Sequence, residues 1–221
     1  MREGQADGTD AAQYQGADVI ALIDYKAGNL TSVRKALAAV GADVYTPEAA
    51  GELADAQGII VPGVGHFAAT AALDTAWVDA ILARVGEGRP LLGICLGLQW
   101  LYEGSEESPE LKGLGLLSGT CHRLRADNDD AQVIKVPHVG WNGLDRLSNA
   151  PIIEGVADGA QVYFTHSYVA PVTTDTSAAT THGERFASVV QRGQISGVQF
   201  HPEKSGDVGL RILRNFMKMA G

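Results

Sequence analysis

The fold of this chain is best predicted from the stretch Pro90-Leu91-Leu92-Gly93-Ile94-Cys95-Leu96-Gly97-Leu98-Gln99-Trp100-Leu101. Its first residues are apolar and predict a short buried strand, and the segment from Leu98 predicts the start of a helix. Cys95 stands between two glycines at this junction, which is the cysteine version of the strand–turn–helix arrangement that presents a nucleophile. The glycines permit a sharp turn and close approach of neighbouring segments. Because a helix start directs N–H groups and partial positive charge at the sulfur, a reactive thiolate is favoured.

Strand and helix patterns alternate along the first half of the chain. A continuous apolar run at 18–23 is typical of a strand buried on both faces, and further strands are predicted at 42–45 and 58–61. Helices are predicted at 28–40 and 75–85. This order predicts an α/β fold, with a mostly parallel central sheet flanked by helices.

After Ser108 the pattern changes to short strand-like segments separated by turns, which predict an antiparallel extension of the sheet. These segments are 116–124, 132–136, 162–167, 187–191 and 195–200. Residues 207–219 predict a closing amphipathic helix. The sequence shows no repeat and no linker, so we predict one domain over 18–221, preceded by a mobile tail over 1–17.

Composition excludes several classes of function. The net charge of −9 argues against nucleic-acid and anionic-membrane partners, and no apolar run has the length of a transmembrane helix. The first seventeen residues lack the basic and apolar regions of a signal peptide. Two cysteines without an export signal suggest the reducing cytoplasm, and Cys121 is interpreted as a packing residue in a strand.

A cysteine nucleophile needs a general base, and His201 is the best placed of six histidines. It lies in Gln199-Phe200-His201-Pro202-Glu203, directly after a predicted strand, and catalytic groups collect at strand ends in such sheets. Pro202 restricts the backbone, so that Glu203 can turn back and hold the imidazole tautomer. A His-Pro-Glu tripeptide by itself is more often a surface turn. Its presence beside the Cys95 turn makes catalysis the better interpretation.

Attack on a carbonyl also requires N–H donors for the oxyanion. One is expected from the backbone of Leu96, the residue after the nucleophile. The second is expected from the loop Val61-Pro62-Gly63-Val64-Gly65, which follows a neighbouring strand. Its glycines let peptide N–H groups be aimed into a site.

Together these motifs resemble those of the class I glutamine amidotransferases. The resemblance is carried by Pro62-Gly63-Val64-Gly65, by the stretch from Gly93 to Gln99, and by Gly197-Val198-Gln199-Phe200-His201-Pro202-Glu203-Lys204-Ser205. Two more motifs, Pro137-His138-Val139-Gly140-Trp141-Asn142 and Tyr163-Phe164-Thr165-His166-Ser167-Tyr168, resemble those of the glutaminase subunits of imidazole glycerol phosphate synthases, in histidine biosynthesis. The resemblance runs from Val19 to Met219 in the order and spacing of that family.

The resemblance implies a triad of Cys95, His201 and Glu203, with Val64 and Leu96 as oxyanion donors. The thiolate would attack the side-chain amide of glutamine, and His201 would protonate the departing ammonia. Water would then hydrolyse the γ-glutamyl thioester. Neither a cofactor nor a metal is implied. The family binds glutamine through positions that match Gly63, Gln99, Glu107, Thr165, His166 and Ser167, although the run containing Glu107 also suits a solvated surface.

The resemblance further implies a partner, a separate (β/α)8-barrel synthase subunit that receives the ammonia and joins it to a phosphorylated intermediate. This acidic chain has nothing resembling a phosphate-binding loop, which fits such a division of labour. Positions matching Asn29, Trp141, Tyr163 and Lys204 should lie near the partner, although Trp141 suits a core position equally well. His138 and His166 are interpreted as loop-shaping groups. The glycines flanking Val64 lead us to expect that its peptide is misaimed until the partner binds.

Three alternatives stay open at this point. The first is the glutaminase of another pathway, such as pyridoxal phosphate, anthranilate or GMP synthesis, against which the segment 138–142 and the free-standing length argue. The second is a peptidase or γ-glutamyl hydrolase on the same scaffold, which would act without a partner. The third is a non-catalytic binding subunit, against which the complete Cys95, His201 and Glu203 set argues.

Overall fold

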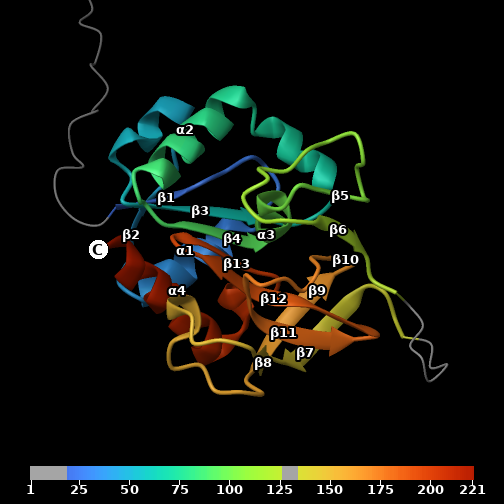
Figure 1. The fold of residues 1–221 in the computed structure, drawn as a ribbon. Helices are drawn as coiled ribbons and strands as arrows, with labels where there is room; N and C mark the ends of the chain where they lie inside the picture. The colour runs from blue at the N-terminus through green and yellow to red at the C-terminus, as the bar shows by residue number, and fades with distance from the viewer. Residues whose placement is uncertain (1–18, 126–133) are drawn as a thin grey trace, which may run out of the picture.

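The central feature is an eight-stranded sheet, seen in the computed structural model, which describes residues 19–125 and 134–221 (Figure 1). Its strands follow the order β2-β1-β3-β4-β13-β12-β11-β8. Neighbouring strands from β2 to β13 pair in parallel, and those from β13 to β8 pair antiparallel. In chain order the strands are β1 (Val19–Leu22), β2 (Asp43–Tyr45), β3 (Gly58–Gly63), β4 (Leu91–Cys95), β8 (Asp145–Arg146), β11 (Thr176–His182), β12 (Glu184–Arg192) and β13 (Ile195–Val198).

Helices cover both faces of the parallel part of the sheet (Figure 1). Helices α1 (Leu30–Ala39) and α4 (Gly206–Ala220) lie on one face, and α2 (Thr75–Gly86) lies on the other with the 3₁₀ turns η1 (Ala50–Asp55) and η2 (Phe67–Ala72). Alternate residues of β1 enter different cores: Ile20 packs with the α1 and α4 residues, and Ala21 with the α2 side. Since both faces are buried, the strand reads as a continuous apolar run.

Side-chain caps fix where two of these helices begin. Asp74 accepts hydrogen bonds from the N–H groups of Ala76 and Trp77 at 3.0 and 3.2 Å, and so starts α2. Asn29 accepts from Ser32 N–H at 3.4 Å and starts α1. These are the residue types that best satisfy the free N–H groups of a first helical turn.

Two smaller sheets lie beside the antiparallel end. In one, β7 (His138–Gly143) pairs antiparallel with β9 (Gln161–His166), placing Trp141 opposite Tyr163. The other has the order β10-β6-β5, with β5 (Gly104–Ser105), β6 (Thr120–Arg123) and β10 (Tyr168–Val169). The remaining elements are the helix α3 (Leu96–Leu101) and the 3₁₀ turns η3 (Pro151–Ile153) and η4 (Pro202–Lys204).

The predicted fold class is confirmed, with three local corrections. Residues 134–136 form no strand, and the strand begins instead at His138, after Pro137; residues 132 and 133 lie outside the described part. The segment predicted at 195–200 for the antiparallel extension ends as a strand at Val198; it pairs antiparallel with β12 as expected, but also in parallel with β4, and so joins the two parts. Strand β11 was not predicted, because its buried run of small residues shows no alternation.

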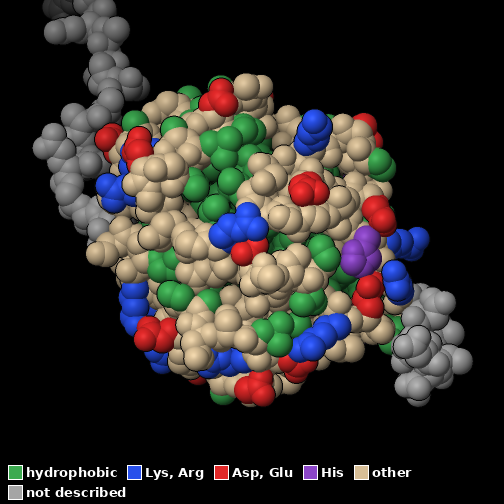
Figure 2. All heavy atoms as spheres, viewed as in Figure 1, with side chains coloured by type: hydrophobic (Ala, Val, Ile, Leu, Met, Phe, Trp, Pro, Cys, Tyr) green, Lys and Arg blue, Asp and Glu red, His purple; other side chains and the backbone are tan. Residues whose placement is uncertain are grey.

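The predicted tail, 1–17, lies outside the described residues, and the single-domain assignment stays a prediction. Among the helices in the described ranges, none is long and apolar enough to cross a membrane. On the face seen in Figure 2, basic and acidic side chains are interspersed, and apolar side chains show near α2.

Candidate active site

Cys95 occupies a sharp turn between β4 and α3. Its backbone has φ +54° and ψ −106°, a conformation that L residues adopt only under constraint. The flanking glycines are required by close approach: a Cβ on Gly97 would lie 1.8 Å from the Val61 carbonyl oxygen, and one on Gly93 2.5 Å from the Gly97 carbonyl oxygen. The sequence prediction of a tight nucleophile turn agrees with this geometry.

His201 and Glu203 form a buried pair just beyond β13. The imidazole Nδ1 lies 2.9 Å from Glu203 Oε1, and the two side chains are 2% and 3% exposed. The His201 backbone is fixed at both ends, because its N–H donates to Tyr163 O and its carbonyl accepts from Ser205 Oγ. Glu203 therefore holds one ring nitrogen and leaves the other, Nε2, available.

The protonation of His201 depends on its two partners. Burial lowers the pKa of His201, but interactions with the Cys95 sulfur and with Glu203 outweigh burial and raise it to about 9. Nε2 nonetheless has no hydrogen-bond partner within ordinary limits. The sulfur is thus near enough to act on the imidazole electrostatically, while the short contact of a working pair is not formed. Catalytic hydrogen bonds are often long without substrate.

A cavity of about 260 Å³ opens beside Cys95. Most of the predicted oxyanion and glutamine-binding residues line it, whereas Gly63 does not. The lining residues are Val64, Gly65, Cys95, Leu96, Gln99, Glu107, Pro137, Thr165, His166, Ser167 and Tyr168. Glu107 is therefore more than a solvated surface charge: its Oε2 also accepts from Phe67 N–H at 2.7 Å.

The second predicted oxyanion donor, the Val64 N–H, already has a hydrogen-bond partner. Val64 N–H donates to Ala27 O at 2.7 Å, so it is already used outside the cavity. Gly65 next to it has φ +94°. Gly63 is confined by the Tyr25 hydroxyl, which would lie 2.0 Å from a Cβ at that position. The Val64 N–H is thus bound by a different loop, the one between β1 and α1, as the misaimed-peptide hypothesis requires, and that hypothesis stays a prediction.

Sequence reasoning missed two polar neighbours of the nucleophile. Gln199 is fully buried, and its Nε2 lies 3.6 Å from Cys95 Sγ. The signal was available, because Gln199 stands two residues before His201 in an extended segment and so shares its side. The second neighbour is Tyr25, whose buried hydroxyl has no hydrogen-bond partner. Burial and the Cys95 charge raise the pKa of Tyr25, which keeps its hydroxyl protonated.

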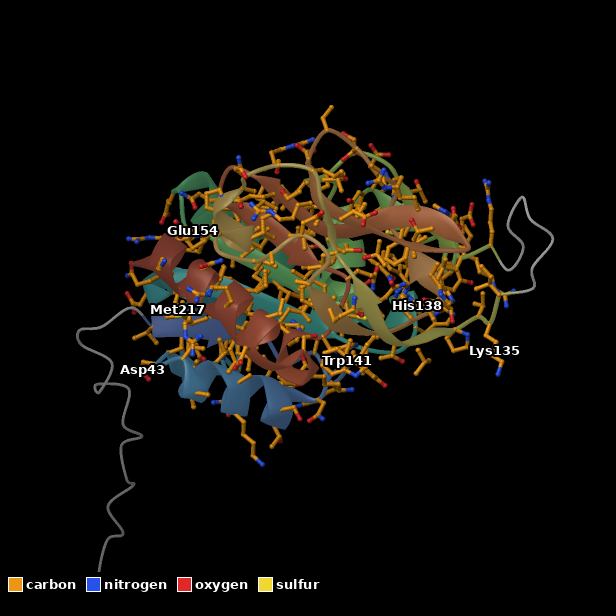
Figure 3. All side chains as sticks on the ribbon, turned by 90° about the horizontal axis from the view of Figure 1, so that it is seen from below. Asp43, Lys135, His138, Trp141, Glu154 and Met217 are labelled. Atoms are coloured by element: carbon orange, nitrogen blue, oxygen red, sulfur yellow. The ribbon has the colours of Figure 1, made fainter. Side chains whose placement is uncertain are left out.

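Three histidines, His138, His166 and His182, form a cluster, of which His166 lines the cavity. The rings of His138 and His182 lie 4.0 Å apart, and His138 Nδ1 is 3.1 Å from His166 Nε2. His138 lies on the same strand, β7, as Trp141, and Figure 3 labels both residues. Because the Tyr168 carbonyl can only accept, His166 Nδ1 donates to it at 3.1 Å. Because burial lowers the pKa of both rings, His166 is neutral at pH 7, and its Nε2 accepts from His138 Nδ1–H.

This histidine cluster predicts that the folded chain loses stability in acid. Burial, then the neighbouring His182, lowers the pKa of His138 to about 4, and burial and His138 lower that of His166 to about 3. The unfolded chain takes up these protons near 6.5, so the free energy of unfolding should fall as pH drops from about 6.5 to 4. Denaturant titrations over this range should give a shallower fall for His138→Phe. Equal slopes would contradict the prediction.

Three of the four predicted partner-facing residues gather on one surface. Trp141 is 57% exposed, which excludes the core position, and its ring meets that of Tyr163 at 6.1 Å. Lys204 Nζ lies 5.6 Å from the Tyr163 ring centre. Figure 3 shows Trp141 at the edge of the molecule. Asn29 serves as the cap of α1, and its place in any interface stays a prediction.

The model of the family "Glutamine amidotransferase class-I" matches residues 21–220, and the chain belongs to this family. A solved structure described as a glutamine amidotransferase has the same fold, with a TM-score of 0.70, 23% identity, and coverage of 93% of this chain and all of that one.

Within that class, the similarity is to one kind of subunit. The imidazole glycerol phosphate synthase subunit HisH of Gloeobacter violaceus is 47% identical over 91% of this chain and 89% of its own length. A chloroplastic imidazole glycerol phosphate synthase of Arabidopsis thaliana is 41% identical over 90% of this chain, which covers 34% of the plant protein. The chain is a member of the glutaminase-subunit family of imidazole glycerol phosphate synthase.

Proposed function

We propose that this chain hydrolyses L-glutamine at Cys95 and supplies the ammonia to a synthase subunit that makes imidazole glycerol phosphate in histidine biosynthesis. The observation that carries the proposal is the constrained Cys95 turn, which lies at the wall of a cavity and whose sulfur interacts with the buried His201–Glu203 pair. The relatives named above favour this pathway over the other amidotransferase pathways.

In the proposed mechanism Cys95 attacks the side-chain carbonyl carbon of glutamine and forms a C–S bond. The negative charge that develops on oxygen would be held by the N–H of Leu96, the first residue of α3, which has no partner within the helix. His201 gives its proton to the amide nitrogen, and the C–N bond breaks to release ammonia. The result is a γ-glutamyl thioester on Cys95.

Hydrolysis of the thioester would restore the enzyme. His201, now neutral, takes a proton from water, which attacks the same carbonyl and displaces the thiolate. Glu203 stabilises the imidazolium in both half-reactions. We assign Glu107 and the segment 165–167 to the amino-acid end of glutamine, because they form the wall of the cavity around Cys95.

The partner is proposed to dock on the surface made by Trp141, Tyr163 and Lys204. The plant relative supports a second functional part, because this chain matches only a third of its length. An exposed tryptophan that meets a half-buried tyrosine, with a lysine over the tyrosine ring, is the kind of cluster that dominates binding energy at protein interfaces. We place the complex in the cytoplasm, where the two free cysteines remain reduced.

Partner dependence gives the test of this function. We expect the isolated chain to release glutamate from glutamine slowly, and the addition of the synthase subunit with its bound ligand to raise kcat by roughly a hundredfold or more, the effect of gaining one oxyanion donor. The physical reason is the Val64 N–H, which is held by Ala27 and must be released. Coupled detection of glutamate measures both rates.

Two results would overturn parts of this proposal. Equal rates with and without the partner would refute the misaimed Val64 peptide and favour a free-standing hydrolase. Failure to form glutamate even in the full complex would refute the glutaminase assignment and favour the binding-subunit alternative.

A further inference from the structure

Two buried glutamines link the cavity wall to the nucleophile. Gln99 Nε2 lies 3.0 Å from Tyr168 O and 3.2 Å from Gln199 Oε1. Gln199 Nε2 in turn lies 3.6 Å from Cys95 Sγ. The Gln99 residue is 4% exposed and Gln199 is fully buried, so water cannot replace these contacts.

The donor and acceptor roles in this series of hydrogen bonds follow from the Tyr168 carbonyl at one end of it. A backbone carbonyl can only accept, so the Gln99 atom that meets Tyr168 O must be the NH₂ group. That same group meets Gln199, which must therefore present its oxygen. The NH₂ group of Gln199 is then left to face the sulfur, and the alternative amide rotation would break the buried bond to Gln99.

The Tyr168 carbonyl also fixes the orientation of the His166 ring. It also accepts from His166 Nδ1 at 3.1 Å, so both of its lone pairs are used. Because the carbonyl has no free acceptor site, neither Gln99 nor His166 can reverse its orientation without leaving a buried polar atom unpaired.

We propose that Gln199 is a positioning residue of the glutaminase reaction, which donates its side-chain N–H to Cys95 Sγ, stabilises the thiolate and holds the sulfur in place for attack. A hydrogen bond to an ionised group is stronger than one to a neutral group, so the donor favours the charged form of the sulfur. The proposal deepens the proposed function and rests on it. It assigns a role to a residue that lies outside the triad and does not line the cavity.

Gln199 acts among other groups that face the sulfur. His201, beyond β13, and Tyr25, beyond β1, both interact with it electrostatically. Glu107, His166 and Tyr168 are the other titratable groups in the described cavity wall. Since all of these remain in a Gln199 variant, a change in the pH dependence of the sulfur can be assigned to the amide.

The test is the rate at which a small alkylating reagent modifies Cys95, followed by peptide mass spectrometry as a function of pH in the full-length chain. Gln199→Met has a similar length but no donor, and we expect the midpoint of the rate profile to move to higher pH. Gln199→Glu keeps the acceptor for Gln99 but presents a carboxylate to the sulfur, and we expect a larger upward shift. In the partner complex, kcat for glutamine should fall roughly tenfold to a hundredfold, with KM less affected.

Gln191→Met is the matched control. That side chain accepts from Ile152 N–H and has no contact with Cys95, so its loss should lower stability without moving the alkylation midpoint. An unchanged midpoint in both Gln199 variants would overturn the proposal. If the methionine variant does not fold, the glutamate variant decides. Alkylation needs no glutamine, so this experiment tests the role of Gln199 even if the glutaminase assignment fails.

Discussion

Replacing Cys95 with alanine should lower glutamine-dependent synthesis by roughly 10⁴-fold or more, while synthesis from added ammonium salts continues. The reason is that Cys95 is the only thiol among the residues that line the described cavity, and without the thioester ammonia is not released from glutamine. The partner subunit needs only ammonia, which this variant does not remove. Product formation by the complex, measured with each nitrogen source, checks both halves of the result.

Cys121→Ala is the control for this experiment. Cys121 is fully buried, and burial raises its pKa so that it stays a thiol. Its loss should cost stability through packing and leave glutamine use intact. Substantial glutamine-dependent synthesis in the Cys95→Ala complex would refute the thioester mechanism.

Gly97→Ala should destabilise the chain by about 3 kcal/mol or prevent folding, because overpacking against backbone has no flexible neighbour to relieve it. The added Cβ would lie 1.8 Å from the Val61 carbonyl oxygen, so α3 and β3 would have to separate. Even if the variant folds, this movement displaces Cys95, and glutaminase activity should fall sharply. Denaturant titration and glutamate release measure the two effects.

Gly86→Ala serves as the matched glycine control. Gly86 is the last residue of α2, and a Cβ there would meet no atom within 4 Å. Alanine favours helix over glycine by up to about 1 kcal/mol, so this variant should be neutral or slightly more stable. Equal stability of the two variants would show that the close approach at Gly97 is absent in solution.

The parallel half of the fold could be predicted because its strands and turns are determined by residues that are close together in the sequence. The run at 18–23 is apolar on both faces, and the glycines around Cys95 mark a turn that only they permit. The missed strand β11 has the opposite character: its small buried residues, such as Ala178 and Ala179, carry no alternation, and its partner β12 determines it.

The site shows the same division. Cys95, His201 and Glu203 could be predicted, since each follows a strand or a proline that fixes its direction. The contact of Gln199 with the sulfur depends on the parallel pairing of β13 with β4. Sequence reasoning missed this pairing, because it assigned residues 195–200 to the antiparallel extension alone. The bond from Val64 to Ala27 could not be predicted either, because it joins two loops whose approach only the folded chain defines.

The pairing of β13 with β4 also determines how well the active-site geometry resists local unfolding. Val198 stands opposite Ile94, so the base and the nucleophile follow the ends of two adjacent strands at the centre of the sheet, and such strands lie about 4.8 Å apart. Central strands open only with the whole molecule, whereas surface loops open locally and often. The arrangement of Cys95 and His201 is therefore lost only when the protein itself unfolds. A movement of the Val64 loop can change the rate of glutamine hydrolysis while Cys95 and His201 keep their positions.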